Sequence, residues 1–293
     1  MTSLLSIRVL LIFCVTIWGW TFVAMKICLA AISPMELIGL RFLLGLPILY
    51  AIIVAKKIPF TFSKEDVKPI AIGAIIIATH FIVQAVGLQF TTATNSSWII
   101  AVTPLAMALL SCLILKEKLG GKEIIGIGIS TFGISLLVFN GDIKNFGGMK
   151  SVGDWIVLFT AHTWALFTIA TRDISRKHHP LVVTFMLFLP MTITCLMYVA
   201  FTSNVSKLYS LETETIFALL FLGTLGTITQ WIWQEGIAKL GAARAGIFMY
   251  LEPIATTVIA IPLLGEKFTT YIALGGTLVL AGVWNAQRNS KQN

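Results

Sequence analysis

Long apolar runs separated by short charged or polar turns make up most of the chain. Ten of these runs are close to the roughly 20 residues that a helix needs to cross the hydrocarbon core of a bilayer. Charges, glycine, proline and short polar turns mark their ends. The longest connections lie near 56–66, 140–150 and 201–212. The ten predicted spans are 7–31, 36–55, 67–90, 94–115, 120–140, 152–171, 180–201, 214–238, 242–264 and 269–286.

The same pattern occurs twice along the chain. The stretch 93–133 recurs at 242–282, and each copy has a proline-broken apolar helix, a Glu-Lys turn and a glycine-bearing apolar helix. Near the start of each half a second match, at an offset of 146 residues, pairs Trp18 with Trp164 and Lys26 with Arg172. The pairs at the longer offset of 149 residues are Pro104 with Pro253, Glu117-Lys118 with Glu266-Lys267, Gly126 with Gly275, and Gly133 with Gly282.

This repeat predicts the fold. Each half holds five predicted spans, which is an odd number, so the second half is expected to lie inverted relative to the first. We therefore predict an all-α integral membrane protein with ten transmembrane helices, built as two inverted five-helix repeats at 1–143 and 144–293. Inverted-topology repeats are typical of secondary transporters.

Composition and charge agree with a membrane protein. Hydrophobic residues make up 57% of the 293 positions and charged residues 12%, about half the charge of an ordinary soluble domain. With a cytoplasmic N-terminus, alternation of the spans puts 15 of the 21 Lys and Arg residues at cytoplasmic ends. We therefore expect a multi-pass protein of the cell membrane with both termini in the cytoplasm. The net charge of +8 then reflects basic loops beside anionic lipids, and no nucleic-acid partner is expected.

The sequence lacks the common motifs of catalysis and cofactor binding. It contains no GxxxxGK[ST] phosphate loop, no HExxH, no GxSxG elbow and no paired-cysteine metal spacing. The four cysteines lie in apolar runs and are expected to pack as small hydrophobic residues. We therefore expect neither an enzyme nor a cofactor or metal site, and a gradient of substrate or ions as the driving force.

Several short motifs, in this order and spacing, resemble those of the EamA-type permeases of the drug/metabolite transporter superfamily. The resemblance covers nearly the whole chain and implies a ten-helix fold around a central cavity, lined mainly by spans 1, 3, 4, 6, 8 and 9. It implies transport of amino acids, related metabolites or other small polar solutes. The motifs are Trp18-Gly19 with Thr21-Phe22-Val23-Ala24, Gly39-Leu40-Arg41-Phe42, Pro104, Glu117-Lys118, Gly126, Gly133, Trp164-Ala165, Pro253, Gly265-Glu266-Lys267, Gly275 and Gly282.

Glu252 is the leading candidate for a transport residue. It lies near the middle of a predicted span, where an ionisable side chain is costly and is usually retained for function. Pro253 follows it and cannot donate a backbone hydrogen bond, which predicts a free carbonyl at Met249. A carboxylate beside a free carbonyl suits a substrate ammonium group or a coupling proton. The alternative is a structural acid, neutral or hydrogen-bonded within the packing.

Other polar and aromatic side chains within spans are candidates for the same cavity. His80 and Gln84 in span 3, and Gln230 and Gln234 in span 8, are each spaced by one helical turn and so share a helix face. The alternative to a role in the cavity is hydrogen bonding between helices. Tryptophans deep within spans suit an apolar or cation–π wall, and their alternative role is ordinary packing. Arg41 is expected to pair with Glu36 or to extend outward. The predicted lining is Trp18, His80, Gln84, Trp98, Trp164, Gln230, Gln234, Tyr250 and Glu252.

The sequence thus predicts a secondary transporter that works by alternating access without ATP. Its expected cargo is a small polar organic metabolite, foremost an amino acid or derivative, with export favoured and proton coupling through Glu252 as an option. The expected partners are this small molecule, protons and the lipid bilayer. A multidrug or cationic-compound efflux pump and an uptake facilitator of the same fold are the alternatives.

Overall fold

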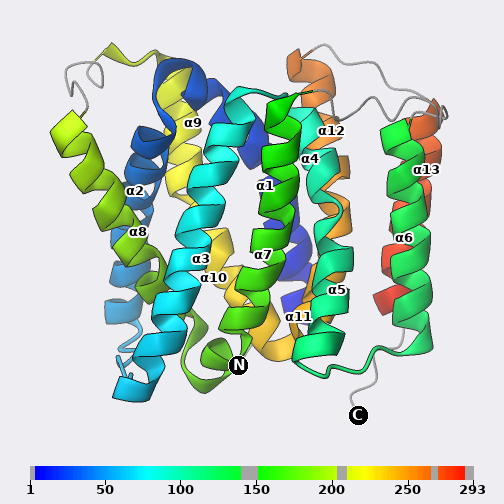
Figure 1. Ribbon diagram of the computed structural model, residues 1–293, viewed down its shortest axis with the longest axis horizontal. Helices are drawn as coiled ribbons and strands as arrows, with labels where there is room; N and C mark the ends of the chain where they lie inside the picture. Colours follow the sequence, from blue (N-terminus) through cyan, green and yellow to red (C-terminus); the bar gives the residue numbers. More distant parts are fainter. Residues whose placement is uncertain (1–3, 140–150, 203–209, 265–269, 288–293) are drawn as a thin grey trace.

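The computed structural model describes residues 4–139, 151–202, 210–264 and 270–287, and within these ranges the chain is helical apart from short turns (Figure 1). The predicted repeat boundary between 143 and 144 lies outside the described residues. The helices are α1 (Leu4–Ala31), α2 (Pro34–Ala55), α3 (Lys64–Gln89), α4 (Ala93–Ile100), α5 (Thr103–Ile114), α6 (Gly121–Phe139), α7 (Val152–Lys177), α8 (Pro180–Thr202), α9 (Thr213–Gly223), α10 (Leu225–Leu240), α11 (Ala242–Gly246), η2 (Ile247–Leu251), α12 (Glu252–Leu264) and α13 (Thr270–Gln287).

Seven helical stretches of the described chain are long and apolar enough to cross a membrane. Five are single helices, α1, α2, α3, α7 and α8; the other two are α4 continued by α5 and α9 continued by α10. All seven coincide with predicted spans, so the protein is a multi-pass membrane protein. The three remaining predicted spans fall on α6, on α11 to α12, and on α13.

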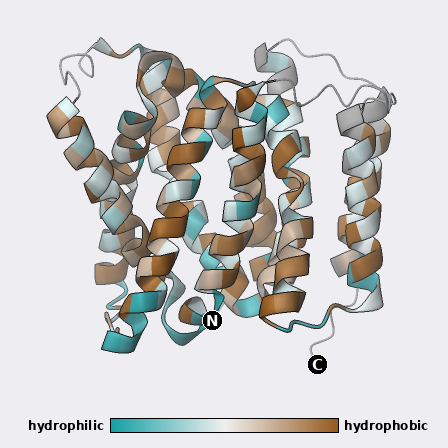
Figure 2. Ribbon diagram, viewed as in Figure 1, coloured by the Kyte–Doolittle hydropathy of each residue, from teal (hydrophilic) through white to brown (hydrophobic). Residues whose placement is uncertain are grey.

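The outer surface of the bundle carries large exposed apolar side chains. Leu113 on α5 is 75% exposed, and Phe132 on α6 and Phe217 on α9 are also largely exposed. Figure 2 shows hydrophobic ribbon along the middle of the helices and hydrophilic segments at the lower end of the bundle. A surface of this kind is stable in lipid and would aggregate in water.

Helices follow one another up and down the bundle, so that both ends of the described chain lie at the same end, which we call the termini end (Figure 1). The turn between α5 and α6 also lies there, whereas α12 ends and α13 begins at the opposite end. This placement is consistent with a repeat whose second copy is inverted.

Two of the predicted spans are interrupted at matching places. The first breaks between α4 and α5 at residues 101–102, with Pro104 in the first turn of α5. The second passes through the short 3-10 helix η2 before Pro253 in α12. The predicted proline break is therefore confirmed in both copies. Irregular backbone at this depth is tolerated beside protein or a cavity, which directs attention to the space between the two segments.

Helices α6 and α13 pack closely through glycine. A Cβ added to Gly126 would lie 2.5 Å from the carbonyl oxygen of Gly282, and one added to Gly133 would lie 2.8 Å from that of Gly275. Between these two contacts, the Ser130 hydroxyl donates a hydrogen bond to the Val279 carbonyl at 3.3 Å. Only glycine allows backbones to approach this closely, as in other membrane helix pairs.

Candidate functional site

A small cavity of about 30 Å³ lies between the two halves of the chain. A water molecule needs roughly 10–15 Å³ of such space, so the cavity has room for two or three waters and no organic solute. Its lining comprises Trp18, Thr21, Phe22, Arg41, His80, Phe81, Gln84, Ile100, Trp164, Gln230, Met249 and Glu252. Six of the nine predicted site residues are therefore brought together here.

Glu252 begins α12, directly after the interruption at η2, and its side chain is 4% exposed. Its Oε2 atom has no hydrogen-bond partner among the described residues. The predicted free carbonyl is wrong, because the backbone N–H of Glu252 donates to the carbonyl of Met249 within the 3-10 turn. The unpaired polar group at this interruption is therefore the Glu252 carboxylate and not the Met249 carbonyl. A carboxylate is costly to bury without a partner.

Arg41 faces the same cavity from α2. Its guanidinium lies 5.0 Å from the ring centroids of both Phe42 and Phe81, and one of its terminal nitrogens donates to the carbonyl of Gly226 at 3.4 Å. Its Nε atom has no hydrogen-bond partner among the described residues. The expectation of an outward side chain is wrong, since Arg41 is 1% exposed. The overlooked signal was its position two turns inside an apolar helix.

The polar pair on α3 lies on one face, as its spacing predicted. His80 and Gln84 both line the cavity and are 3% and 6% exposed. The Nδ1 atom of His80 lies 3.1 Å from the carbonyl of Thr160 and 3.1 Å from the hydroxyl of Thr163, both on α7. His80 is therefore anchored across the interface between the halves, and it presents the rest of its ring to the cavity wall.

Aromatic rings form one side of the cavity. Trp18 and Trp164, the pair matched by the repeat, meet edge to face with ring centroids 5.0 Å apart. Trp233 on α10 lies 5.0 Å from Trp18 and 6.0 Å from Trp164, and sequence analysis had not selected it. The Nε1 atom of Trp18 donates to Thr229, whereas that of Trp164 has no partner among the described residues. Trp18 and Trp164 line the cavity, whereas Trp233 is fully buried beside them. The cavity wall therefore offers two indole rings and the N–H group of Trp164.

Three predicted site residues lie elsewhere. The amide oxygen of Gln234 accepts a hydrogen bond from Ser175 at 2.8 Å, joining α10 to α7. The hydroxyl of Tyr250 bonds that of Thr131 at 2.8 Å, and Trp98 packs with Tyr250 in the cluster beside α6 and α13. These contacts match the alternative role, hydrogen bonding and packing between helices.

A cation holds the helices together at each end of the bundle. At one end Lys26 donates to the carbonyls of Leu88 and Thr91, at 2.7 Å and 2.6 Å, and so ties α1 to the turn after α3. At the termini end its repeat mate Arg172, on α7, pairs with Glu117 at 3.2 Å. Both cations are half-buried and are bonded between helices.

In the described residues, membrane-length helices surround a small polar and aromatic cavity, and this arrangement defines a multi-pass membrane protein with an internal cavity. Sequence comparison identifies its class. The sequence profile of the EamA-like transporter family matches residues 5–139 and again residues 151–286. The chain belongs to the EamA-like transporter family, whose members are transporters and not enzymes.

Individual relatives are distant but align over almost the whole chain. An uncharacterized transporter of Archaeoglobus fulgidus is 26% identical over 94% of this chain and 96% of its own length. A probable amino-acid metabolite efflux pump of Escherichia coli is 24% identical over 94% of this chain and 93% of its own. A crystal structure that superposes with a TM-score of 0.75, at 17% identity, covers 96% of this chain and 98% of its own and shares the fold.

Proposed function

We propose that this protein is a secondary transporter that moves an amino acid or a close derivative across the cell membrane by alternating access. The observation that carries the proposal is a pair of buried side chains of opposite charge. Arg41 and Glu252 line one cavity from different halves, and each keeps a polar atom without a partner among the described residues.

The two charges suit a zwitterion. An α-amino acid carries an ammonium group, which a carboxylate such as Glu252 binds, and a carboxylate, which a guanidinium binds in a fork of parallel hydrogen bonds. Burial makes each unpaired charge costly, and a ligand that pairs both removes that cost. The tryptophan wall and Gln230 would contact the remainder of the solute.

The size of the cavity requires movement during transport. A space that holds two or three waters cannot hold an amino acid, so the cavity must widen before such a solute binds. Binding therefore requires the helices to separate at one end or the other. The contacts of Lys26 and of Arg172 lie where such separation would occur, and the interrupted segments supply backbone that can bend.

The contacts between matched residues support two inverted five-helix repeats. A two-fold axis brings each residue that lies on it against its own mate, and makes neighbouring contacts reciprocal. Trp18 meets Trp164, and Ser130 meets Val279, which is its mate at the offset of 149 residues. The glycine contacts are reciprocal, Gly126 with Gly282 and Gly133 with Gly275, and the family profile matches once in each half.

Export is the direction we propose, with both termini in the cytoplasm. The excess of Lys and Arg at the predicted cytoplasmic ends supports this orientation. The amino-acid metabolite efflux pumps named among the relatives, from Escherichia coli and Salmonella typhimurium, support an outward cargo of this chemical class.

The test is transport by purified protein in proteoliposomes, with labelled amino acids and with or without a pH gradient. We expect Glu252→Gln to lower the transport rate at least tenfold, because the ammonium group and any coupled proton lose their partner. The matched control is Glu235→Gln, since Glu235 lies near the end of α10 in an ion pair with Lys239. Equal rates for Glu252→Gln and the native protein would contradict the assignment of the site.

A cationic drug is the second candidate cargo, and the tryptophan wall favours it. Trp18 and Trp164 offer aromatic rings to a flat cation, with Glu252 in the same cavity for its charge. Arg41 in the same cavity opposes a cation. Transport of cationic dyes, unaffected by competing amino acids, would select this candidate over the first.

A further inference from the structure

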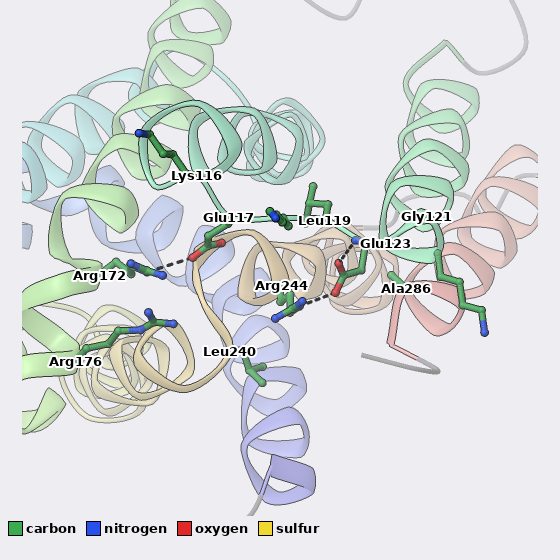
Figure 3. Close-up of a pocket in the computed structure, with 13 residues that line it drawn as sticks. Lys116, Glu117, Leu119, Gly121, Glu123, Arg172, Arg176, Leu240, Arg244 and Ala286 are labelled. Carbon is green, nitrogen blue, oxygen red and sulfur yellow. Dashed lines mark hydrogen bonds and ion pairs between the residues drawn. The ribbon is translucent and has the colours of Figure 1, made fainter. Parts of the chain in front are cut away.

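A second and larger cavity, of about 700 Å³, opens at the termini end between the α5–α6 turn, α6, α7, the end of α10, α11 and α13 (Figure 3). It shares no lining residue with the central cavity. Six of its lining side chains are cations: Lys116, Lys118, Lys122, Arg172, Arg176 and Arg244.

The acidic side chains of this cavity are already engaged by the protein. Glu117 pairs with Arg172 at 3.2 Å and accepts the backbone N–H groups of Ala242 and Ala243 at 3.3 Å and 3.2 Å. Glu123 pairs with Arg244 at 2.6 Å and accepts the N–H of Gly120 at 2.7 Å (Figure 3). With six cations and two carboxylates, the lining keeps an excess of four positive charges.

The remaining cations gather over one short turn and the end of α7. Lys116 and Lys118 are exposed, and Lys116 has a positive φ of 53°, which turns the chain sharply at the end of α5. Arg176 donates its Nε to the carbonyl of Ala238, and this contact holds its guanidinium at the cavity wall. Like charges brought together in this way repel one another, so an anion between them would stabilise the arrangement.

The same turn is flanked by apolar side chains that face outward. Leu113 and Ile114 precede it and are 75% and 55% exposed, and Ile124 and Ile125 follow it and are both 57% exposed. A cationic cavity bordered by lipid-facing apolar surface matches the two parts of an acidic phospholipid, its phosphate group and its acyl chains. Basic pockets between membrane helices at the cytoplasmic surface are known to take such headgroups.

We propose that this cavity binds a phosphate-bearing anion at the membrane surface. Guanidinium groups hold phosphate oxygens through forked hydrogen bonds, and lysines contribute point charges. The apolar border favours the headgroup of an acidic phospholipid as the source, and a soluble phosphate ester carries the same chemistry. A filled site would bridge the α5–α6 turn to α7 and would stabilise this end of the bundle.

The test measures thermal unfolding of the full-length protein in detergent, and lipid retention by native mass spectrometry. The additions are phosphatidylglycerol, phosphatidylcholine, and glycerol phosphate at millimolar concentration. We expect phosphatidylglycerol to raise the midpoint of unfolding and phosphatidylcholine not to do so. In the double variant Lys116→Gln/Lys118→Gln the affinity for phosphatidylglycerol should fall tenfold or more, because each lysine near the surface contributes about a factor of five.

The matched control is Lys57→Gln/Lys64→Gln at the α2–α3 turn. It removes the same charge, and Lys57, like Lys116, has a positive φ, of 51°. An equal loss of affinity for phosphatidylglycerol in both double variants would contradict the proposed site. Equal stabilisation of the native protein by the two phospholipids would also contradict it. Stabilisation by glycerol phosphate alone would keep the site and reassign its source to a soluble ester. If the double variant does not fold, Lys118→Gln alone serves, with the same outcomes.

Discussion

Arg41 and Glu252 are buried charges of opposite sign that line one cavity. Glu252 stands beside a proline inside an apolar run, and that pattern alone marked it as a transport candidate. Arg41 lies near the outer end of its predicted span, where pairing with Glu36 or an outward side chain was expected. Its actual direction depends on Phe42 and Phe81, which enclose the guanidinium, and on the Gly226 carbonyl, which accepts its hydrogen bond. Such tertiary contacts are not encoded in the local pattern.

The role of Arg41 in substrate selection can be measured directly. We expect Arg41→Gln to weaken transport of an amino acid at least tenfold, while transport of the matching amine, which lacks the carboxylate, stays the same or rises. The reason is that only the carboxylate of the solute needs the guanidinium. The measurement is KM for the two solutes in proteoliposomes. A parallel loss for both would show that Arg41 acts through packing alone.

At the scale of helices, the sequence predicted where helices occur better than it predicted their local geometry and neighbours. The apolar runs placed the helices correctly, because a helix in lipid must satisfy its own backbone groups over a full crossing. The proline break at Pro253 was also predicted, but not the 3-10 turn that satisfies the Met249 carbonyl. Gln234 shows the same limit, since polar spacing gives a helix face but not the neighbour that meets it, here Ser175.

The seam between α6 and α13 gives a test at this scale. We expect Gly126→Ala to destabilise the protein by about 1–3 kcal/mol, because the new methyl group would meet the Gly282 carbonyl. Gly128→Ala is the control on the same helix, since nothing lies within 4 Å of a Cβ there. Thermal unfolding in detergent measures both. Indistinguishable unfolding midpoints for the two variants would show that α6 and α13 can move apart at this contact without loss of stability.

For the whole molecule, the repeat carried most of what sequence could predict. The matched positions identified residues that come together in space, such as Trp18 with Trp164. The matched positions of the repeat do not predict the size of the cavity, because that size depends on how the two halves are tilted relative to each other. The repeat also did not reveal the cationic cavity, whose lysines and arginines come from segments at least 50 residues apart.

The inversion itself predicts opposite exposure of two turns. In a background where exposed Cys112 is replaced by Ser, we expect an impermeant thiol reagent added outside cells to label Thr270→Cys and not Lys118→Cys. Lys118 lies in the turn between α5 and α6, and Thr270 begins α13 at the other end of the bundle (Figure 1). Labelling of both positions from one side would contradict the inverted arrangement.

The small volume of the central cavity has a consequence for the proposed transport cycle. A space of about 30 Å³ has no room for an amino acid, so the two halves pack together without cargo between them. For the proposed carrier we therefore expect a return step that needs no solute, and net efflux without exchange. Preloaded vesicles should therefore empty into solute-free buffer about as fast as into buffer that contains the same amino acid. Efflux that starts only when external solute is added would show that the return step needs a passenger.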